Sequence, residues 1–230
     1  MNDTLHVAII PDGNRRWAKQ NGLKGYYDLY QRGIDGMLDI SEAAFKLGVT
    51  HLSLWGSSHA NMSGRNADFV QNLDRVFREN IRRFATHPII AEYDISIRVV
   101  GEWRDSFTPE TVRVMEDAIA ETAHRTGRAL TLLIDYSGSR ERDAAVAELR
   151  LDPLKHPTLR EYAWTSYLPD LNLAIRTGSW TDPHNSEGFL SLLADNTQFA
   201  YPSVLWPDFT PQHLADILAD YNSREKRGGK

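Results

Sequence analysis

The chain has 230 residues, of which 41% are hydrophobic and 25% charged, and it carries a formal net charge of −5 with no cysteine. This length suits one compact domain or at most two small ones, and the lack of cysteine excludes disulfides, thiolate metal sites and a cysteine nucleophile. The mildly acidic balance disfavours nucleic acid as a partner. No apolar run approaches the roughly 18 residues of a membrane span, and the N-terminus does not resemble a signal peptide, so we expect a cytoplasmic protein.

Short runs rich in Val, Ile and Leu recur along the chain, and most end in a polar or glycine-containing stretch. Their apolar character is continuous rather than alternating, which is typical of strands that are covered on both faces, as in a parallel sheet. Five runs predict strands, and a sixth, weaker run follows near the C-terminus: Leu5–Ile10, Val49–Trp55, Ile95–Val100, Leu130–Ile134, Leu171–Ile175 and Ser203–Leu205.

Residues with helical periodicity fill the intervals between these strands. Apolar residues recur every three or four positions over two long stretches, Arg32–Leu47 and Phe69–Phe84. Thr108 followed by Pro109 predicts the start of a third helix, and Pro211–Tyr221 a closing one. The alternation indicates an α/β fold, with a mainly parallel sheet of about six strands surrounded by helices. Such sheets bind ligands at the carboxyl ends of their strands, so the candidate site lies in the loops there.

The segment after the first predicted strand carries the densest set of reactive side chains. Asp12 can bind Mg²⁺ through oxygen, and Gly13 permits a close approach of the backbone. Arg15 and Arg16 offer forked donors that suit phosphate oxygens, and the start of a predicted helix also favours anions. Together these features favour a diphosphate–magnesium site. The alternative is a turn that caps a helix, with solvated arginines and a core Trp17.

The stretch from His6 to Lys19, HVAIIPDGNRRWAK, resembles the first signature of the cis-prenyltransferases, the undecaprenyl diphosphate synthase family. Three later segments resemble further motifs of that family in the same order. They are LPDLNLAIRTG from Leu168, VLWPDF from Val204 and RGG from Arg227. The resemblance spans nearly the whole chain.

The resemblance implies a parallel sheet wrapped by helices, one domain over residues 1–230, and a homodimer. Family members condense an allylic prenyl diphosphate with isopentenyl diphosphate to make a cis double bond, and they use Mg²⁺. By position, Asp12 is implied to bind the metal and, with Asn14, to act at the reacting centre. The two long predicted helices would then line a hydrophobic prenyl tunnel. The residues implied to bind substrate diphosphate are Gly13, Arg15, Arg16, Arg65, Arg176 and Arg227.

The chain departs from the family pattern on the acceptor side. After Arg176 the segment is longer than in the family and lacks a second phosphate-binding arginine. Gln198 stands where the family has a metal-associated glutamate, and Tyr30 where it has a histidine. Each charge-assisted hydrogen bond contributes roughly 1.5–3 kcal/mol, so losing two or three would weaken the binding of a second diphosphate. The candidate residues of this altered acceptor site are Asn61, Tyr30, Trp180, His184 and Gln198.

Three functions stay open at this point. The first is cis condensation with isopentenyl diphosphate. The second is prenyl transfer to another small acceptor, either an aromatic molecule or a C5 diphosphate joined head to middle, as in lavandulyl-type synthases. Aromatic residues such as Trp55 and Trp180 would suit a flat acceptor. The third is a non-catalytic partner subunit, against which the intact Asp12, Asn14 and Arg16 argue.

Overall fold

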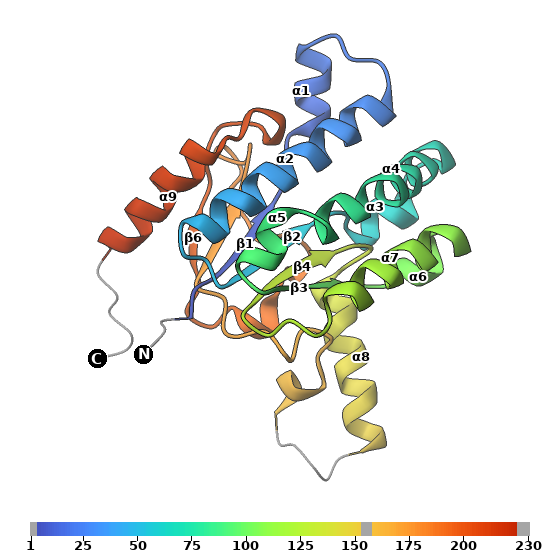
Figure 1. Cartoon of the computed structure of the whole chain (residues 1–230), viewed down its shortest axis with the longest axis vertical. Helices are drawn as coiled ribbons and strands as arrows, with labels where there is room; N and C mark the ends of the chain where they lie inside the picture. Colours follow the sequence, from blue (N-terminus) through green and yellow to red (C-terminus); the bar gives the residue numbers. More distant parts are fainter. Residues whose placement is uncertain (1–3, 153–157, 225–230) are drawn as a thin grey trace.

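The computed structural model describes residues 4–152 and 158–224. This part of the chain holds a six-stranded sheet with the order β3-β4-β2-β1-β5-β6, and every neighbouring pair of strands is parallel (Figure 1). The central strand β1 pairs with β2 on one side and with β5 on the other. The strands are β1 (His6–Ile10), β2 (His51–Trp55), β3 (Ile95–Val100), β4 (Arg128–Leu133), β5 (Leu173–Arg176) and β6 (Gln198–Ala200).

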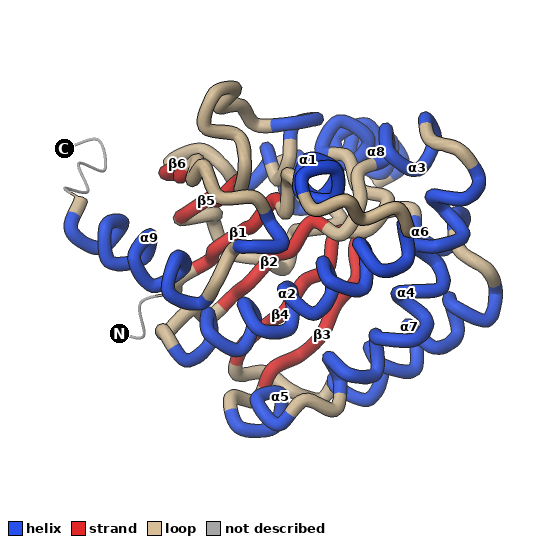
Figure 2. Tube along the Cα trace, turned by 90° about the horizontal axis from the view of Figure 1, so that it is seen from above, coloured by secondary structure: helices blue, strands red, loops and turns tan. Residues whose placement is uncertain are grey.

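Helices cover both faces of the sheet. On one face α9, α2, α4 and α7 lie side by side, each packed on the next, while α8 lies on the other side of the sheet (Figure 2). The helices are α1 (Asn14–Gln20), α2 (Tyr26–Lys46), α3 (His59–Gly64), α4 (Ala67–Ala85), α5 (Pro88–Glu92), α6 (Trp103–Ser106), α7 (Pro109–Thr122), α8 (Gly138–Leu151) and α9 (Pro211–Ser223). Short 3-10 turns are found at Leu159–Tyr162, Ser186–Gly188, Ser191–Leu193 and Trp206–Asp208.

The sheet separates two hydrophobic cores, and β1 contributes to both. Val7 and Ile9 join the larger core, which also contains residues of α2, α4, α7 and α9. Ala8 and Ile10 join the smaller core with the aromatic rings of Tyr136 and other residues. All five residues of β1 are buried. The continuous apolar runs of the sequence are therefore explained by a strand that has no solvent-facing side.

The fold class and the first five strands predicted from the sequence are confirmed, with boundaries that differ by two residues at most. The long predicted helices are also confirmed: α2 begins earlier than Arg32, at Tyr26, and α4 begins at Ala67, after the capping residue Asn66. Thr108 caps α7 by accepting a hydrogen bond from the backbone N–H of Thr111. The closing helix α9 begins at Pro211, as expected.

The sixth predicted strand, Ser203–Leu205, is wrong. The edge strand is instead β6, whose residues are exposed or only partly buried, so the apolar signal that marks central strands is weak there. Pro202 follows β6 and has no N–H to donate to a ladder. The chain beyond it leaves the sheet, and the backbone N–H of Trp206 donates to the carbonyl oxygen of Asp12 over 3.0 Å.

Helix α8 was not predicted, because its sequence, GSRERDAAVAELRL, has weak apolar periodicity and buries only Gly138, Glu141 and Ala145. The buried Glu141 carboxylate accepts hydrogen bonds from the Tyr136 hydroxyl over 2.5 Å and from the backbone N–H of Thr165 over 2.9 Å. Across residues 4–152 and 158–224, no helix combines the length and the apolar character that a membrane span requires.

Candidate active site

A cavity of about 680 Å³ opens at the carboxyl ends of β1, β2 and β5, beside helices α2, α3 and α4. Its apolar lining includes buried side chains of α2 and α4, such as Ile34, Met37, Leu73 and Phe77. Its charged lining comes chiefly from residues 12–19, Arg65 and residues 176–187, several of which are exposed. The cavity thus has a polar end that faces solvent and an apolar part inside the molecule.

The loop after β1 is held by contacts with the end of β5. The backbone N–H of Asp12 donates to Thr177 Oγ1 over 2.9 Å, and the same hydroxyl donates to the Asp12 carbonyl oxygen over 2.8 Å. Gly13 adopts a φ of 101°, a region that favours glycine. Because β1 and β5 are parallel neighbours, their carboxyl ends meet, and two loops distant in sequence form one wall of the cavity.

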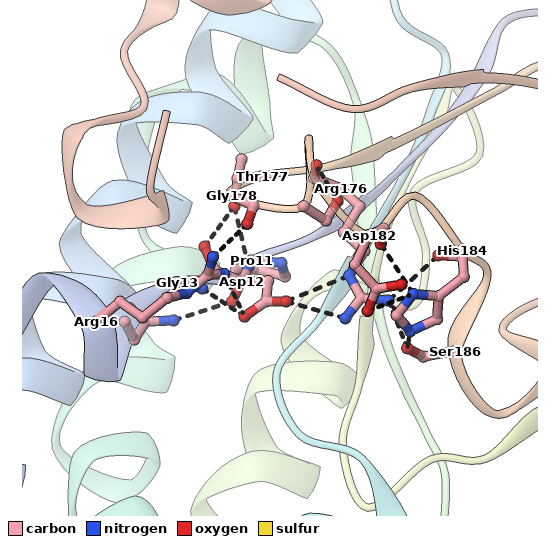
Figure 3. A network of polar contacts seen from close by, with 12 residues as sticks. Pro11, Asp12, Gly13, Arg16, Arg176, Thr177, Gly178, Asp182, His184 and Ser186 are labelled. Atoms are coloured by element: carbon pink, nitrogen blue, oxygen red, sulfur yellow. Dashed lines mark hydrogen bonds and ion pairs between the residues drawn. The ribbon is translucent and has the colours of Figure 1, made fainter. Parts of the chain in front are cut away.

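The Asp12 carboxylate lies between two arginines (Figure 3). Its Oδ2 accepts hydrogen bonds from Arg176 Nη2 over 2.9 Å and from Arg176 Nε over 3.3 Å. Its Oδ1 accepts the backbone N–H of Gly13 over 2.5 Å and lies 3.4 Å from Arg16 Nη2. Arg16 also donates through Nη1 to the carbonyl oxygen of Gly178. The first sequence motif and the second, LPDLNLAIRTG, thus meet around one carboxylate.

Arg176 is also held from its other side. Its Nη1 donates to Ser186 Oγ over 2.5 Å and lies 2.8 Å from His184 Nε2 (Figure 3). The other ring nitrogen of His184, Nδ1, lies 2.9 Å from the Asp182 carbonyl oxygen and 3.3 Å from Asp182 Oδ2. The altered segment after Arg176 therefore contacts the arginine through an imidazole, a hydroxyl and the His184 carbonyl oxygen.

Two predicted site residues present polar groups to the cavity. Asn14 donates through Nδ2 to the Pro11 carbonyl oxygen over 2.9 Å, while its buried Oδ1 has no hydrogen-bond partner among the described residues. Burial raises the pKa of Tyr30 to about 12, so its phenol is a neutral hydrogen-bond donor at pH 7. An unpartnered buried oxygen in a cavity is a place for a ligand to bind.

Arg65 stands beside Tyr30 at the C-cap of α3. Its guanidinium lies over the ring of Phe69 at 4.3 Å, and Tyr30 meets the same ring edge-on. Burial and, next to it, the charge of Arg15 lower the pKa of Arg65. Both causes disfavour the charged form of Arg65. A bound anion would favour it, because the anion would pair with the guanidinium and offset the repulsion from Arg15.

The net charge of the side chains that line the cavity is opposite in sign to the net charge of the whole chain. Among the described lining residues, cationic side chains outnumber carboxylates by three, although the whole chain is acidic. The carboxylates are Asp12 and Glu187. The cationic residues are Arg15, Arg16, Lys19, Arg65 and Arg176. Such an arrangement attracts polyanions to this end of the sheet.

Several predicted acceptor residues lie elsewhere. Asn61 and Tyr30 line the cavity, whereas Trp180 is 70% exposed and lies outside it. Gln198 begins β6 opposite Leu173, about 10 Å along the sheet from the carboxyl end of β5, and accepts a hydrogen bond from Arg224. Arg227 lies outside the described residues.

Sequence reasoning missed cavity residues that no single motif marks. Lys19 lies one helical turn after Arg15, and this spacing on α1 could have revealed it. Ser186 and Glu187 lie in the lengthened segment, where only the fold shows that they reach the cavity. The apolar lining from α2 and α4 could not be told from ordinary core by its pattern.

Comparison with known proteins agrees with this geometry. A family model described as putative undecaprenyl diphosphate synthase matches residues 10–229. The chain is 32% identical to an isoprenyl transferase of Geobacter sulfurreducens, over 98% of this chain and 92% of the relative. The chain belongs to the undecaprenyl diphosphate synthase family. It is accordingly a prenyltransferase.

Another member of the family is equally well covered. This is the ditrans,polycis-undecaprenyl-diphosphate synthase, (2E,6E)-farnesyl-diphosphate specific, of Micrococcus luteus, 30% identical over 97% of this chain and 90% of the relative. A solved lavandulyl diphosphate synthase from Lavandula x intermedia, in complex with dimethylallyl diphosphate, superposes with a TM-score of 0.89 over 100% and 99% of the two chains. Its identity is 24%, so this likeness shows the fold alone.

Proposed function

We propose that this prenyltransferase condenses an allylic prenyl diphosphate with isopentenyl diphosphate and forms a cis double bond. The observation that carries the proposal is the cavity itself, which joins a cationic end around Asp12 to an apolar interior between α2 and α4. A prenyl diphosphate has the same two parts. Each C5 unit that enters the apolar part would contribute about 3–4 kcal/mol, at ~0.8 kcal/mol per buried methylene.

Mg²⁺ fits the oxygen donors at this end of the cavity. No cluster of three or more His, Asp or Glu side chains suited to a metal is found within residues 4–152 and 158–224. Mg²⁺ often binds through one or two carboxylates together with substrate phosphates, and Asp12, partly exposed at the cavity, can serve as the protein ligand. When bound, the ion would stabilise the negative charge that develops on the leaving diphosphate.

The side chains of the protein would share that task. We assign Arg15, Arg16 and Arg65 to the donor diphosphate, because these cationic residues line the cavity near Asp12. Gly13 has no side chain and would allow the diphosphate to approach the backbone. Arg176 is assigned to the acceptor diphosphate. Asn14, whose Oδ1 is unpartnered, would face the reacting carbons. As the allylic C–O bond breaks, these groups stabilise the departing diphosphate while the new C–C bond forms and the acceptor loses a proton.

Two alternatives, a non-standard acceptor and a non-catalytic subunit, have less support. Curated relatives named isoprenyl transferase or undecaprenyl diphosphate synthase match nearly the full chain at about the same identity. The loop that carries Asp12 and Arg16 is complete and faces the cavity, which a non-catalytic subunit does not require. A homodimer in the cytoplasm completes the proposal, on the strength of the resemblance to the family.

One assay tests the proposed reaction. Purified protein is incubated with Mg²⁺ and dimethylallyl, geranyl or farnesyl diphosphate, with and without isopentenyl diphosphate, and the products are identified by mass. Elongation that requires isopentenyl diphosphate is the expected result. Diphosphate release without elongation would point to another acceptor, and complete inactivity to a partner subunit.

A pair of variants locates the chemistry. Asp12→Ala should abolish turnover, since the proposed metal ligand is lost. Asp170→Ala is the matched control, because this exposed carboxylate from the same motif as Arg176 does not line the cavity. Full activity in Asp12→Ala would overturn the assigned mechanism.

A further inference from the structure

Arg176 has little hydrogen-bonding capacity left for a substrate. Its side chain is only 14% exposed. The Nε and Nη2 edge is directed at Asp12, and Nη1 is directed at His184 and Ser186 (Figure 3). The edge formed by Nε and Nη2 is a fork that suits a phosphate, and the Asp12 carboxylate already occupies it.

Asp12 is engaged in the same way. Oδ2 accepts two N–H groups of Arg176, and Oδ1 accepts the Gly13 N–H and lies near Arg16. The guanidinium of Arg176 therefore supplies the positive charge that a metal ion would supply at this carboxylate. A metal on Asp12 and a phosphate on Arg176 compete with the same ion pair.

We propose that the Asp12–Arg176 ion pair makes the binding of a divalent cation and of a diphosphate mutually dependent. The inference rests on the proposed function, which places both ligands at these residues. A cation alone would displace Arg176 from Asp12 and leave a mostly buried guanidinium without its partner. A diphosphate alone would draw Arg176 away and leave the Asp12 carboxylate beside another anion. When both ligands arrive, each freed side chain gains a new partner, and the two ligands attract each other.

The segment after Arg176 holds the arginine in place for this exchange. His184 and Ser186 contact Nη1, on the side away from Asp12. These contacts with Nη1 can persist while the Nε–Nη2 edge of Arg176 exchanges the Asp12 carboxylate for a phosphate. His184 and Ser186 are therefore positioning residues for Arg176.

The first arm of the test measures a cation without an anion. Mn²⁺ stands in for Mg²⁺, and free Mn²⁺ is measured by electron paramagnetic resonance during titration of the purified protein. Arg176→Gln should bind Mn²⁺ about tenfold or more tightly than the natural chain, within the usual range of coupling between sites. Arg65→Gln is the matched control, since it removes a cation from the same cavity that has no hydrogen bond or ion pair with Asp12 among the described residues. Its effect should be clearly smaller.

The second arm measures inorganic pyrophosphate by calorimetry in the presence of EDTA. Asp12→Asn removes the negative charge that holds Arg176 and keeps the shape of the side chain, and it should bind pyrophosphate about tenfold or more tightly than the natural chain. Glu187→Gln is the control, because it removes the other carboxylate of the cavity and leaves the ion pair intact.

The two arms separate this inference from the proposed reaction, because neither uses a prenyl substrate. Tighter single-ligand binding in Arg176→Gln and Asp12→Asn, beyond that of the controls, supports the inference even if elongation is not found. The inference would be overturned, even if the protein is active, by two results together. Arg176→Gln would bind Mn²⁺ no more tightly than Arg65→Gln, and Asp12→Asn would bind pyrophosphate no more tightly than the natural chain. Thermal unfolding of each variant checks that it is folded.

Discussion

The backbone of Gly13 packs directly against the side chain of Leu205. A Cβ added to Gly13 would lie 2.7 Å from Leu205 Cδ2, well inside the normal contact distance. The loop that carries Asp12 thus depends on a residue close to the other end of the chain. Glycine is required here both for its positive φ and for the space it leaves.

Replacing this glycine should damage both stability and turnover. In Gly13→Ala, the left-handed backbone costs about 1–2 kcal/mol, and the overlap with Leu205 adds about 1–3 kcal/mol. Because relief of the overlap moves the Asp12 loop, prenyl transfer should fall sharply. Urea unfolding and the rate of elongation measure the two effects.

The matched control is Gly48→Ala. Gly48 also has a positive φ, 92°, but apart from its two neighbours in the chain no described residue has an atom within 4 Å of an added Cβ. Its stability should fall by the backbone cost of about 1–2 kcal/mol alone, with turnover unchanged. Equal losses of stability and activity at the two positions would contradict the role given to Leu205.

Asn14 should matter more for the reaction than for stability. Its Nδ2 donates one hydrogen bond to Pro11, and its Oδ1 has no partner among the described residues. Asn14→Ala should therefore cost about 1 kcal/mol of stability and lower kcat at least a hundredfold, as does the loss of a side chain that acts on the transition state. Asn21→Ala is the control, since Asn21 makes the same kind of bond, to the Trp17 carbonyl oxygen, outside the cavity. Similar kcat values for the two variants would remove Asn14 from the reacting centre.

Leu73 offers a test of the proposed prenyl tunnel. It is buried on α4 and lines the apolar part of the cavity. Leu73→Ala should shift the products to longer chains and Leu73→Trp to shorter ones, as read by mass. Leu218→Ala is the control, because Leu218 is buried in α9 away from the cavity. Both alanine variants should lose about 2–5 kcal/mol of stability. An unchanged product length in both Leu73 variants would indicate that Leu73 belongs to the ordinary hydrophobic core and does not line a prenyl tunnel.

Acid should destabilise the protein through His6. Burial lowers the pKa of His6 to about 4, and its Nε2 lies 2.9 Å from the buried Ser53 hydroxyl. The folded chain keeps His6 neutral while the unfolded chain protonates it near pH 6.5. The free energy of unfolding should therefore be unaffected by this group above about pH 6.5 and fall by about 3 kcal/mol as the pH drops to 4.

Denaturant unfolding at several pH values measures this effect. His6→Gln should be less stable at pH 7, because one buried hydrogen bond is lost, but its stability should change less between pH 6.5 and pH 4. Burial also lowers the pKa of His51, so the stability of His6→Gln should keep a smaller dependence on pH. Parallel profiles for the two proteins would show that His6 is not the titrating group.

The kind of fold and the chemistry of the first loop can be inferred from the amino-acid sequence alone. Strands such as His6–Ile10 are buried on both faces, so they must be apolar throughout, and this constraint is visible without a structure. The residues from Asp12 to Arg16 are adjacent in sequence, so their combination of carboxylate, glycine and arginines was also visible. Local pattern could not find β6 or α8, because neither depends on a strong apolar period.

Which distant residues come into contact depends on the three-dimensional fold. The parallel pairing of β1 with β5 brings Arg176 onto Asp12, and the turn after it brings His184 and Ser186 onto Arg176. It also leaves Gln198 at the far end of its strand, although its motif suggested a place at the site. Composition and spacing report the chemistry that a segment can offer. Which groups stand within 3 Å of one another depends on strand order and on the path of the loops, and these are set by packing across the whole chain.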